Sequence, residues 1–426
     1  MGNAMRRYWL PALLSSELPE PEGDPRHVQL LGQDLVAFRD AEGKVGILDE
    51  LCCHRGASLL LGRVEDRGIR CIYHGWKFAA DGTVLDTPNV SDPRFKERIK
   101  APAYPVQEAG GIIWTYLGPK DKCPPFPQWP FFDVPGPNRL TTKHVIECNF
   151  VQVLEGLVDS SHLGVLHLNS LRASRDSGLA FANKIKSMQF DQAPVLDAEL
   201  TGFGFHYAAI REIANQGEER TEVRITAFVS PCFVVNPNGD VLTIVVPASD
   251  GRSNFFHVFW DTERRINEEP LRTEHLAFAG LDAATLSNFG LTEEYRGHQA
   301  RPCRQNRFLQ DREAMRSGGS FTGLPGIVEE DVVVSVSSGP IRNRSAEHLA
   351  AADRAVTCLY KVLLDCTRRV SAGEDPVGLH SDMATVRGVS SVLKPDQTWQ
   401  ALVPGHHGIQ AQVATATRAA ATNLQR

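Results

Sequence analysis

The sequence lacks the features that mark membrane, secreted or nucleic-acid-binding proteins. Its longest apolar runs are far shorter than a bilayer span, and Trp9 and Pro11 interrupt the apolar N-terminal stretch, so we expect neither a membrane segment nor a signal peptide. Nine cysteines in 426 residues are too few for a disulfide scaffold, which favours a cytoplasmic protein. A formal charge of −6 without a basic stripe argues against a nucleic acid partner.

Nucleotide-binding loops and internal repeats are also missing. The glycine-rich runs near residues 110 and 317 lack the strand-to-helix context of such a loop, so no flavin or nicotinamide site is expected in this chain. The length allows two or three domains with a sizeable buried core.

Two pairs of cysteine and histidine lie one loop apart, Cys52-x-His54 and Cys71-x-x-His74. Two thiolates and two imidazoles can hold one zinc ion or one small iron–sulfur cluster. Zinc sites of this composition usually have both cysteines in one pair and both histidines in the other, whereas each pair here has one of each. The mixed arrangement suits a [2Fe–2S] cluster with the cysteines on one iron and the histidines on the other. The spacing resembles the Rieske motif; zinc is the alternative, and Cys53 is expected to be a small filler.

Residues 1–137 are predicted to form an all-β domain that carries both pairs. Short apolar runs alternate with glycine-containing turns, and Asp81-Gly82 is a strong hairpin signal. Gly56 and Gly75 are expected to let the backbone approach the cluster sulfides and donate N–H groups to them. Trp76 is expected to be a core aromatic residue. The predicted strands cover residues 6–14, 28–31, 35–39, 45–48, 69–72, 76–78, 83–85 and 110–117.

A second group of candidate ligands lies between Glu155 and His167. On a continuous helix Glu155, Asp159 and His162 would share one face, and Gly164 would loosen the helix so that His167 could meet His162. Two histidines and one carboxylate form the facial triad of mononuclear non-haem Fe(II). Taken alone, two histidines at this spacing are more often hydrogen-bonded side chains without a metal.

The run resembles the pattern Glu-x3-Asp-x2-His-x4-His of Rieske non-haem iron aromatic-ring-hydroxylating oxygenases, and every specified position matches. The resemblance extends from Trp9 to about Cys366 and is to the terminal oxygenase α subunit of the phthalate-dioxygenase-like branch. It implies that His162 and His167 bind the mononuclear Fe(II). It also implies that Asp159 is a catalytic residue that links a ligand histidine to the cluster ligand His74 of a neighbouring subunit.

The third iron ligand is expected downstream. In that branch it is the Asp of a Gln-Asp pair, which corresponds here to Glu330-Asp331, so Asp331 is the predicted ligand. The Glu at the Gln position is a departure from the family pattern. Asp311 is the alternative, although Asp311-Arg312 is more typical of a structural ion pair. The carboxylates considered in this region are Asp311, Glu313, Glu329, Glu330, Asp331 and Asp353.

Residues 138–371 are predicted to form the catalytic domain, an antiparallel sheet covered by helices, which makes the whole chain α+β. Strands are predicted at 204–211, 221–229, 241–247 and 254–260, a packing helix from Asp353, and an extended C-terminal tail or oligomer contact over 372–426.

One face of the second of these strands carries the candidate substrate contacts. Alternation places Arg224, Thr226 and Phe228 on that face. Arg224 or Arg211 could bind a substrate carboxylate, with Ser160 as a further candidate. In the alternative interpretation, both arginines are exposed and pair with Glu222 or Glu212.

The resemblance implies a terminal oxygenase that uses O2 to hydroxylate, dihydroxylate or O-demethylate an aromatic substrate, such as a phthalate or a benzoate. Electrons from NAD(P)H would arrive through a separate flavin and iron–sulfur reductase, or through a ferredoxin and its reductase. Electron delivery between subunits implies a homotrimer or a stacked hexamer. The alternative is a Rieske electron-transfer protein without oxygenase activity.

Overall fold

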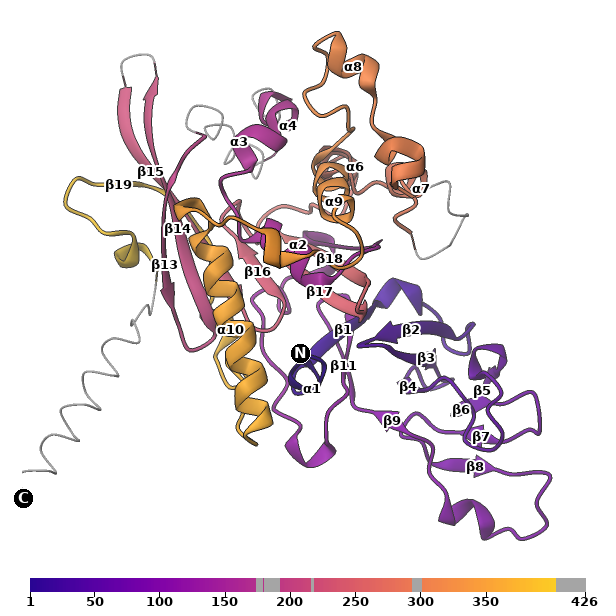
Figure 1. Cartoon of the computed structure of the whole chain (residues 1–426). Coiled ribbons are helices and arrows are strands. Elements are labelled where there is room, and N and C mark those ends of the chain that lie inside the picture. The colour runs from indigo at the N-terminus through magenta and orange to yellow at the C-terminus, as the bar shows by residue number, and fades with distance from the viewer. Residues whose placement is uncertain (174–178, 180–191, 216–217, 293–300, 404–426) are drawn as a thin grey trace, which may run out of the picture.

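The N-terminal part of the chain forms three small antiparallel sheets (Figure 1). The computed structural model describes residues 1–173, 179, 192–215, 218–292 and 301–403. Strands pair as β1-β11-β10, β2-β3-β4-β9 and β5-β6-β7-β8. Short hairpins link most neighbours, as the turn signals predict. The strands are β1 (Trp9–Leu14), β2 (Arg26–Leu30), β3 (Gln33–Arg39), β4 (Val45–Asp49), β5 (Arg63–Glu65), β6 (Gly68–Arg70), β7 (Lys77–Phe78), β8 (Val84–Asp86), β9 (Ala103–Tyr104), β10 (Val106–Ala109) and β11 (Ile112–Tyr116).

The second part is built on one antiparallel sheet, for which the described residues supply eight strands. Its order is β12-β18-β17-β16-β15-β14-β13, and β19 pairs with residues 221–225 of β15. β17 and β18 are buried along nearly their whole length, so they read as continuous apolar runs. The strands are β12 (Arg139–Ile146), β13 (Val195–Leu200), β14 (Gly204–Asn215), β15 (Glu218–Val229), β16 (Phe233–Asn236), β17 (Val241–Ser249), β18 (Arg252–Trp260) and β19 (Val389–Leu393).

Helices cover this sheet, as the predicted α+β class requires (Figure 1). The long helix α10 lies beside β13 and β14, and its buried residues include Leu359, Val362 and Cys366 at the predicted helical spacing. Every helix within the described ranges is too short or too polar to cross a bilayer. The helices are α1 (Gly2–Met5), α2 (Phe150–Leu157), α3 (Leu163–Leu166), α4 (Leu168–Ala173), α6 (Leu271–Ala279), α7 (Ala283–Asn288), α8 (Arg312–Arg316), α9 (Ile327–Ser337) and α10 (Arg354–Ser371).

The two parts share one hydrophobic core, which joins β1 and β11 to the inner strands of the large sheet. The predicted extended tail is wrong for residues 372–403. There the chain returns to the sheet as β19, and the buried Trp399 donates to Asp197 Oδ2 at 2.8 Å. Residues 404–426 lie outside the described residues.

Candidate metal centres

The two cysteine–histidine loops have the same backbone hydrogen bonds although their spacings differ. In each loop the cysteine N–H donates to the carbonyl oxygen five residues later, and the glycine N–H donates to the carbonyl oxygen of that cysteine. The N–H groups of Gly56 and Gly75 are therefore engaged by backbone oxygens within their own loops, whereas the prediction had them donate to cluster sulfides. Both glycines have positive φ angles, +72° and +76°, which a side chain would disfavour.

These loops bring two buried thiols and two imidazoles together. Cys52 and Cys71 are 3% and 2% exposed, and the rings of His54 and His74 lie 4.5 Å apart. Burial and the neighbouring Cys71 raise the pKa of Cys52 to about 11. Trp76 is buried, as predicted, and its ring also stacks on His54 at 4.4 Å with an interplanar angle of 6°. Cys53 is exposed between the ligand positions.

The run from Glu155 to His167 is not one helix, which corrects the prediction. α2 ends at Leu157, and α3 starts at Leu163. Between them the Asp159 carboxylate accepts hydrogen bonds from the backbone N–H and the hydroxyl of Ser161, at 2.7 and 2.6 Å. This local bond competes with helix formation and turns the chain, so His162 and His167 flank the short helix α3.

His162, His167 and Asp331 nevertheless converge. Their potential ligand atoms all lie within 4.8 Å of one another. Asp331 Oδ1 lies 3.2 Å from His167 Nε2 and 3.7 Å from His162 Nε2. Asp331 is on α9, which packs on α2, so the two sequence segments meet across a helix pair. Asp311, the alternative ligand, instead caps α8 by accepting from the N–H groups of Glu313 and Ala314.

In each candidate ligand histidine, a carboxylate lies beside the Nδ1 nitrogen. Asp159 Oδ2 lies 3.4 Å from His162 Nδ1, the contact that the resemblance implies. Glu330 Oε2 lies 2.7 Å from His167 Nδ1, and Glu330 also accepts from the Thr322 hydroxyl at 2.6 Å. The departure from the family's Gln therefore provides a carboxylate that fixes the ring orientation of His167. Nothing local in the sequence signals this pair, because the two residues are far apart along the chain.

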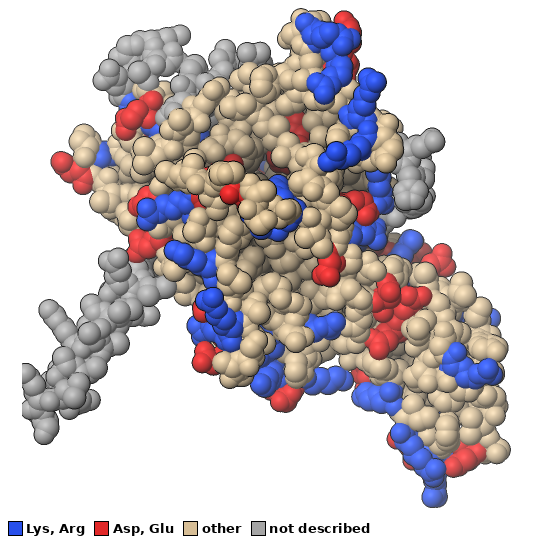
Figure 2. All heavy atoms as spheres, in the orientation of Figure 1, with Lys and Arg blue, Asp and Glu red and all other residues tan. Residues whose placement is uncertain are grey.

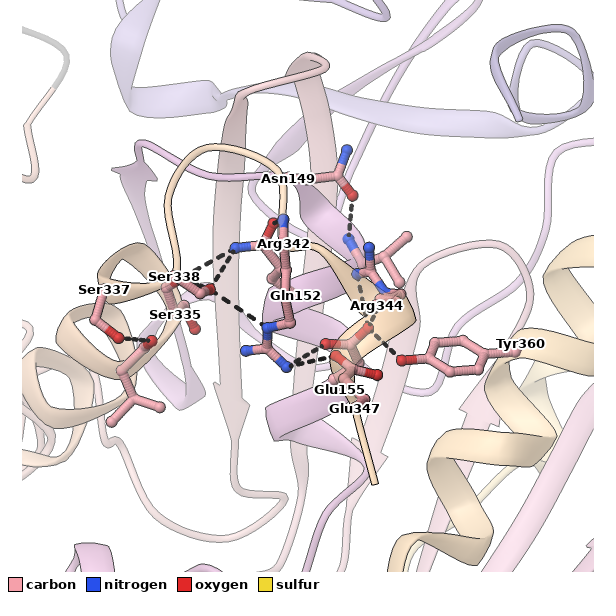
Figure 3. A network of polar contacts seen from close by, with 12 residues as sticks. Asn149, Gln152, Glu155, Ser335, Ser337, Ser338, Arg342, Arg344, Glu347 and Tyr360 are labelled. Carbon is pink, nitrogen blue, oxygen red and sulfur yellow. Dashed lines mark hydrogen bonds and ion pairs between the residues drawn. The ribbon is translucent and has the colours of Figure 1, made fainter. Parts of the chain in front are cut away.

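The Glu155 carboxylate lies in a polar network that links α2 to the chain around Arg342 and to Tyr360 on α10 (Figure 3). Its carboxylate accepts from Arg342 Nη1 at 2.9 Å, Arg344 Nε at 2.8 Å and the Tyr360 hydroxyl at 2.7 Å. Gln152, one turn earlier on α2, donates to the Ser335 carbonyl oxygen at 3.0 Å. The network ties α2, α9 and α10 together, and so holds in place α9, the helix that carries Asp331.

A cavity of about 150 Å³ opens beside His162, His167 and Asp331. Much of its wall is apolar, with residues such as Val153 and Phe259. Polar side chains gather on the sheet side, and Ser160 adds another from the chain after α2. The polar lining residues of the sheet and its turns are Tyr207, Arg224, Thr226, Asn236, Asn238, Thr243 and His257.

Arg224 lies in this cavity wall, as the strand alternation predicts. It is 4% exposed and donates to Asn238 Oδ1, so the alternative interpretation of an exposed strand residue is wrong. Burial, with the nearby charge of Arg211, lowers the pKa of Arg224 to about 9, which leaves it protonated at neutral pH.

Of the other two candidate substrate contacts, Ser160 lines the cavity and Arg211 does not. Arg211 is also buried, but it donates to the Ser160 carbonyl oxygen at 2.8 Å and is not among the residues that line the cavity. It supports the turn that carries Asp159. Ser160 is buried and lines the cavity. No sequence pattern pointed to two further lining residues, His257 on β18 and Asn238 between β16 and β17.

Known proteins match both parts of the chain. Residues 8–105 match the family described as "Rieske [2Fe-2S] domain", and residues 115–420 match "LigXa C-terminal domain like". The phthalate 4,5-dioxygenase oxygenase subunit of Pseudomonas putida is 38% identical over 416 residues, which cover 94% of this chain and 90% of that protein. The chain belongs to the Rieske non-haem iron oxygenases.

Two further matches support this Rieske oxygenase assignment. The 3-chlorobenzoate-3,4-dioxygenase oxygenase subunit of Comamonas testosteroni is 32% identical, over 89% of this chain and 88% of that protein. The crystal structure of dicamba monooxygenase bound to dicamba has a TM-score of 0.57 at 16% identity, over 86% of this chain and 98% of that chain, and shows the same fold. The zinc protein and the electron carrier without oxygenase activity are therefore wrong alternatives.

A Rieske oxygenase carries a [2Fe–2S] cluster and mononuclear iron, and this chain has residues that fit both. Two buried thiols beside two imidazoles match the unequal ligands of the cluster. Two imidazoles and one carboxylate within 4.8 Å match the facial triad of non-haem Fe(II). Burial raises the pKa of Asp331, but the two histidine charges outweigh this and keep it below its usual value, so the carboxylate is ionised and able to bind a cation.

Iron binding to the metal-free oxygenase is expected to release about one proton near neutral pH. Burial lowers the pKa of His167, but Asp331 and Glu330 raise it to about 10, above its unfolded value. A metal ion must displace this proton, so the affinity for Fe(II) should rise about tenfold per pH unit as the pH increases toward 10. Calorimetric titration of the metal-free protein in buffers of different ionisation enthalpy counts the protons. A pH-independent affinity with no proton release would contradict the assignment of His167.

Proposed function

We propose that this terminal oxygenase acts on an aromatic carboxylate. The observation that carries the proposal is Arg224, a buried guanidinium among the polar groups on the sheet side of a cavity whose remaining wall is apolar, beside the candidate iron ligands. Apolar walls suit an aromatic ring, and a guanidinium binds a carboxylate through two parallel hydrogen bonds. Two of the relatives above are named for phthalate and 3-chlorobenzoate, which supports this substrate class.

In this proposal Cys52, His54, Cys71 and His74 hold the cluster, and His162, His167 and Asp331 hold the ferrous ion. When bound, the cluster stores single electrons and the ferrous ion activates O2 for hydroxylation, dihydroxylation or O-demethylation. Asp159 and Glu330 orient the two histidines, Arg224 positions the ring, and the apolar wall excludes water. The protein is proposed to be cytoplasmic and to be fed by an NAD(P)H-dependent reductase, directly or through a ferredoxin. That relatives are named as oxygenase subunits supports a separate electron donor.

The proposed assembly is a ring, either a homotrimer or a stacked hexamer, in which electrons cross between subunits. Figure 1 places β5–β7, which flank the cluster loops, at the outer end of the N-terminal part, across the molecule from α3 and α9. The surface at these loops is rich in apolar side chains, with Leu51 and Ile72 each 58% exposed and Tyr73 54% exposed, although Arg55 lies 5.6 Å over the Tyr73 ring. Such a surface suits contact with another copy. There the partner subunit's His74 would reach Asp159.

The test of substrate and assembly combines two inactive variants. His74→Ala removes the cluster path and His162→Ala removes an iron ligand, and each protein alone should form no product from phthalate or benzoate. Co-expressed chains should recover about a quarter of wild-type turnover, because that fraction of sites in a ring pairs an intact cluster with an intact iron site. No recovery would contradict electron transfer between subunits. Turnover of neutral methyl esters as fast as of the acids would contradict the carboxylate proposal.

A further inference from the structure

The chain between β8 and β9 folds over the second cluster loop. Trp76 Nε1 donates to Asn89 Oδ1 at 2.8 Å. A Cβ at Gly75 would lie 2.7 Å from Pro88 Cγ, so these two segments are in close contact. The Phe95 ring meets Trp76 edge-on at 5.8 Å, and Trp76 stacks on His54. Two packed aromatic rings thus connect the outer side of this segment to one imidazole of the cluster site.

The outer side of this segment is basic, although the whole chain has a charge of −6. Residues 91–100 contain four basic side chains against two acidic ones. We call the four basic residues the basic ridge. Figure 2 shows lysine and arginine side chains, with acidic ones beside them, at the far end of the N-terminal lobe, where Figure 1 draws the chain after β8. The basic ridge consists of Arg94, Lys96, Arg98 and Lys100.

Local ion pairs leave most of this charge available. Arg98 lies 3.7 Å from Asp92 with 71% of its side chain exposed, and Lys100 lies 3.3 Å from Asp81 with 54% exposed. Exposed pairs of this kind contribute little and exchange readily with a new partner. Lys96 donates to a backbone carbonyl oxygen, which leaves its charge unbalanced by that contact.

The two histidines of the cluster site therefore lead to two different surfaces. His74 contacts Tyr73, with ring centroids 3.9 Å apart, and Tyr73 belongs to the apolar surface with Leu51 and Ile72. His54 leads through Trp76 and Phe95 to the basic ridge. Two separate surfaces would let the cluster receive electrons from one partner while it stays in contact with the other. The apolar surface suits a permanent contact between subunits, whereas the charged one suits a short-lived encounter.

We propose that the basic ridge is the docking site for the external electron donor, an iron–sulfur protein with an acidic surface. This inference rests on the proposed function for the external donor and for assigning the apolar surface to the neighbouring subunit. In each encounter the donor is oxidised by one electron and the cluster is reduced by one, without a net proton transfer between the proteins. Opposite charges accelerate such an encounter by about 10- to 1,000-fold, and salt screens the effect.

The test compares two charge-reversal variants of the assembled protein. Arg94→Glu/Arg98→Glu changes the basic ridge, and the control Arg312→Glu/Arg316→Glu makes the same charge change on exposed α8. The probe is a reduced, acidic plant-type [2Fe–2S] ferredoxin. Stopped-flow absorbance should show cluster reduction slowed by about tenfold or more at low salt in the ridge variant alone, with a weaker salt dependence. Oxidised ferredoxin should also bind the immobilised ridge variant more weakly than the control.

Two outcomes would overturn this inference. Equal rates and affinities in both variants would place docking elsewhere, and loss of the oligomer in the ridge variant would make the ridge a contact between copies. Dithionite reduces the cluster without docking, so a single turnover of dithionite-reduced wild-type protein tests the proposed function independently. If the dithionite-reduced protein forms product but the ridge variant is reduced by ferredoxin as fast as the control, only the proposed docking site is refuted.

Discussion

The Asp331→Ala protein is expected to retain its cluster, lose its mononuclear iron and form no product. Asp331 Oδ1 is within 3.7 Å of both candidate histidine nitrogens, and Asp331 supplies the carboxylate of the triad. Without it, two imidazoles must hold Fe(II) alone, and His167 keeps only Glu330 as a carboxylate neighbour. Removing a group that merely orients a ligand typically costs about 10- to 100-fold in affinity or activity, so removing a ligand should exceed about 100-fold.

The matched control is Asp311→Ala, which deletes the other candidate carboxylate. Asp311 is exposed and caps α8, so its loss should cost about 1 kcal/mol of stability and leave the iron content unchanged. Iron analysis and the visible spectrum of both variants separate the two centres. If Asp331→Ala kept its mononuclear iron while Asp311→Ala lost it, the assignment of the third ligand would be reversed.

The Arg224→Gln protein is expected to bind aromatic carboxylates about 10- to 100-fold more weakly and to treat neutral esters as the wild type does. A hydrogen bond to a charged group contributes about 1.5–3 kcal/mol, which corresponds to that range in affinity. Gln keeps a side-chain donor for Asn238 but removes the charge, so the fold should be preserved. The effect should appear in KM or substrate Kd more than in kcat, because the guanidinium binds the substrate before any bond changes.

Arg220→Gln is the control on the same strand, because Arg220 is exposed and pairs with Glu222. It should leave substrate affinity unchanged. Substrate Kd values for the acid and its methyl ester, measured for both variants by difference spectroscopy, decide between the interpretations. An Arg224→Gln protein with unaltered affinity for the acid would exclude this residue as the carboxylate site.

The cluster loops could be predicted from the sequence because their chemistry is local. Cys52 and His54, like Cys71 and His74, lie within a few residues of each other, so spacing alone brings the ligand atoms together. The strands around them follow from short apolar runs and glycine turns, which also act over a few residues. The spacing does not predict the stacking of Trp76 on His54, because that contact depends on how the two loops face each other.

The sequence itself contains a signal against one continuous helix from Glu155 to His167. Asp159 is followed by two serines, and short polar side chains bond to the nearby backbone and end helices. A continuous helix would place Glu155 and Asp159 on one face. In the structure α2 ends at Leu157, and the Glu155 carboxylate accepts hydrogen bonds from Arg342 and Tyr360. The closeness of His162 to His167 could still be predicted, because the chain needs only a turn, not a particular helix, to bring these two side chains together.

Contacts between distant segments could not be predicted. The carboxylate of Glu330 behind His167 depends on the packing of α9 against α2, which no local pattern encodes. β19 illustrates the same limit, because residues 389–393 have weak periodicity and become a strand only by pairing with β15. Such elements are fixed by tertiary contacts rather than by local propensity.

Iron analysis of the anaerobically purified protein, with electron paramagnetic resonance of its reduced form, tests the central claim most directly. The account predicts about three iron atoms per chain, two in a histidine-ligated cluster and one mononuclear. It also predicts that His162→Ala loses only the mononuclear iron, whereas His54→Ala loses only the cluster. A protein whose iron and cluster signal were both unaffected by His162→Ala would contradict it.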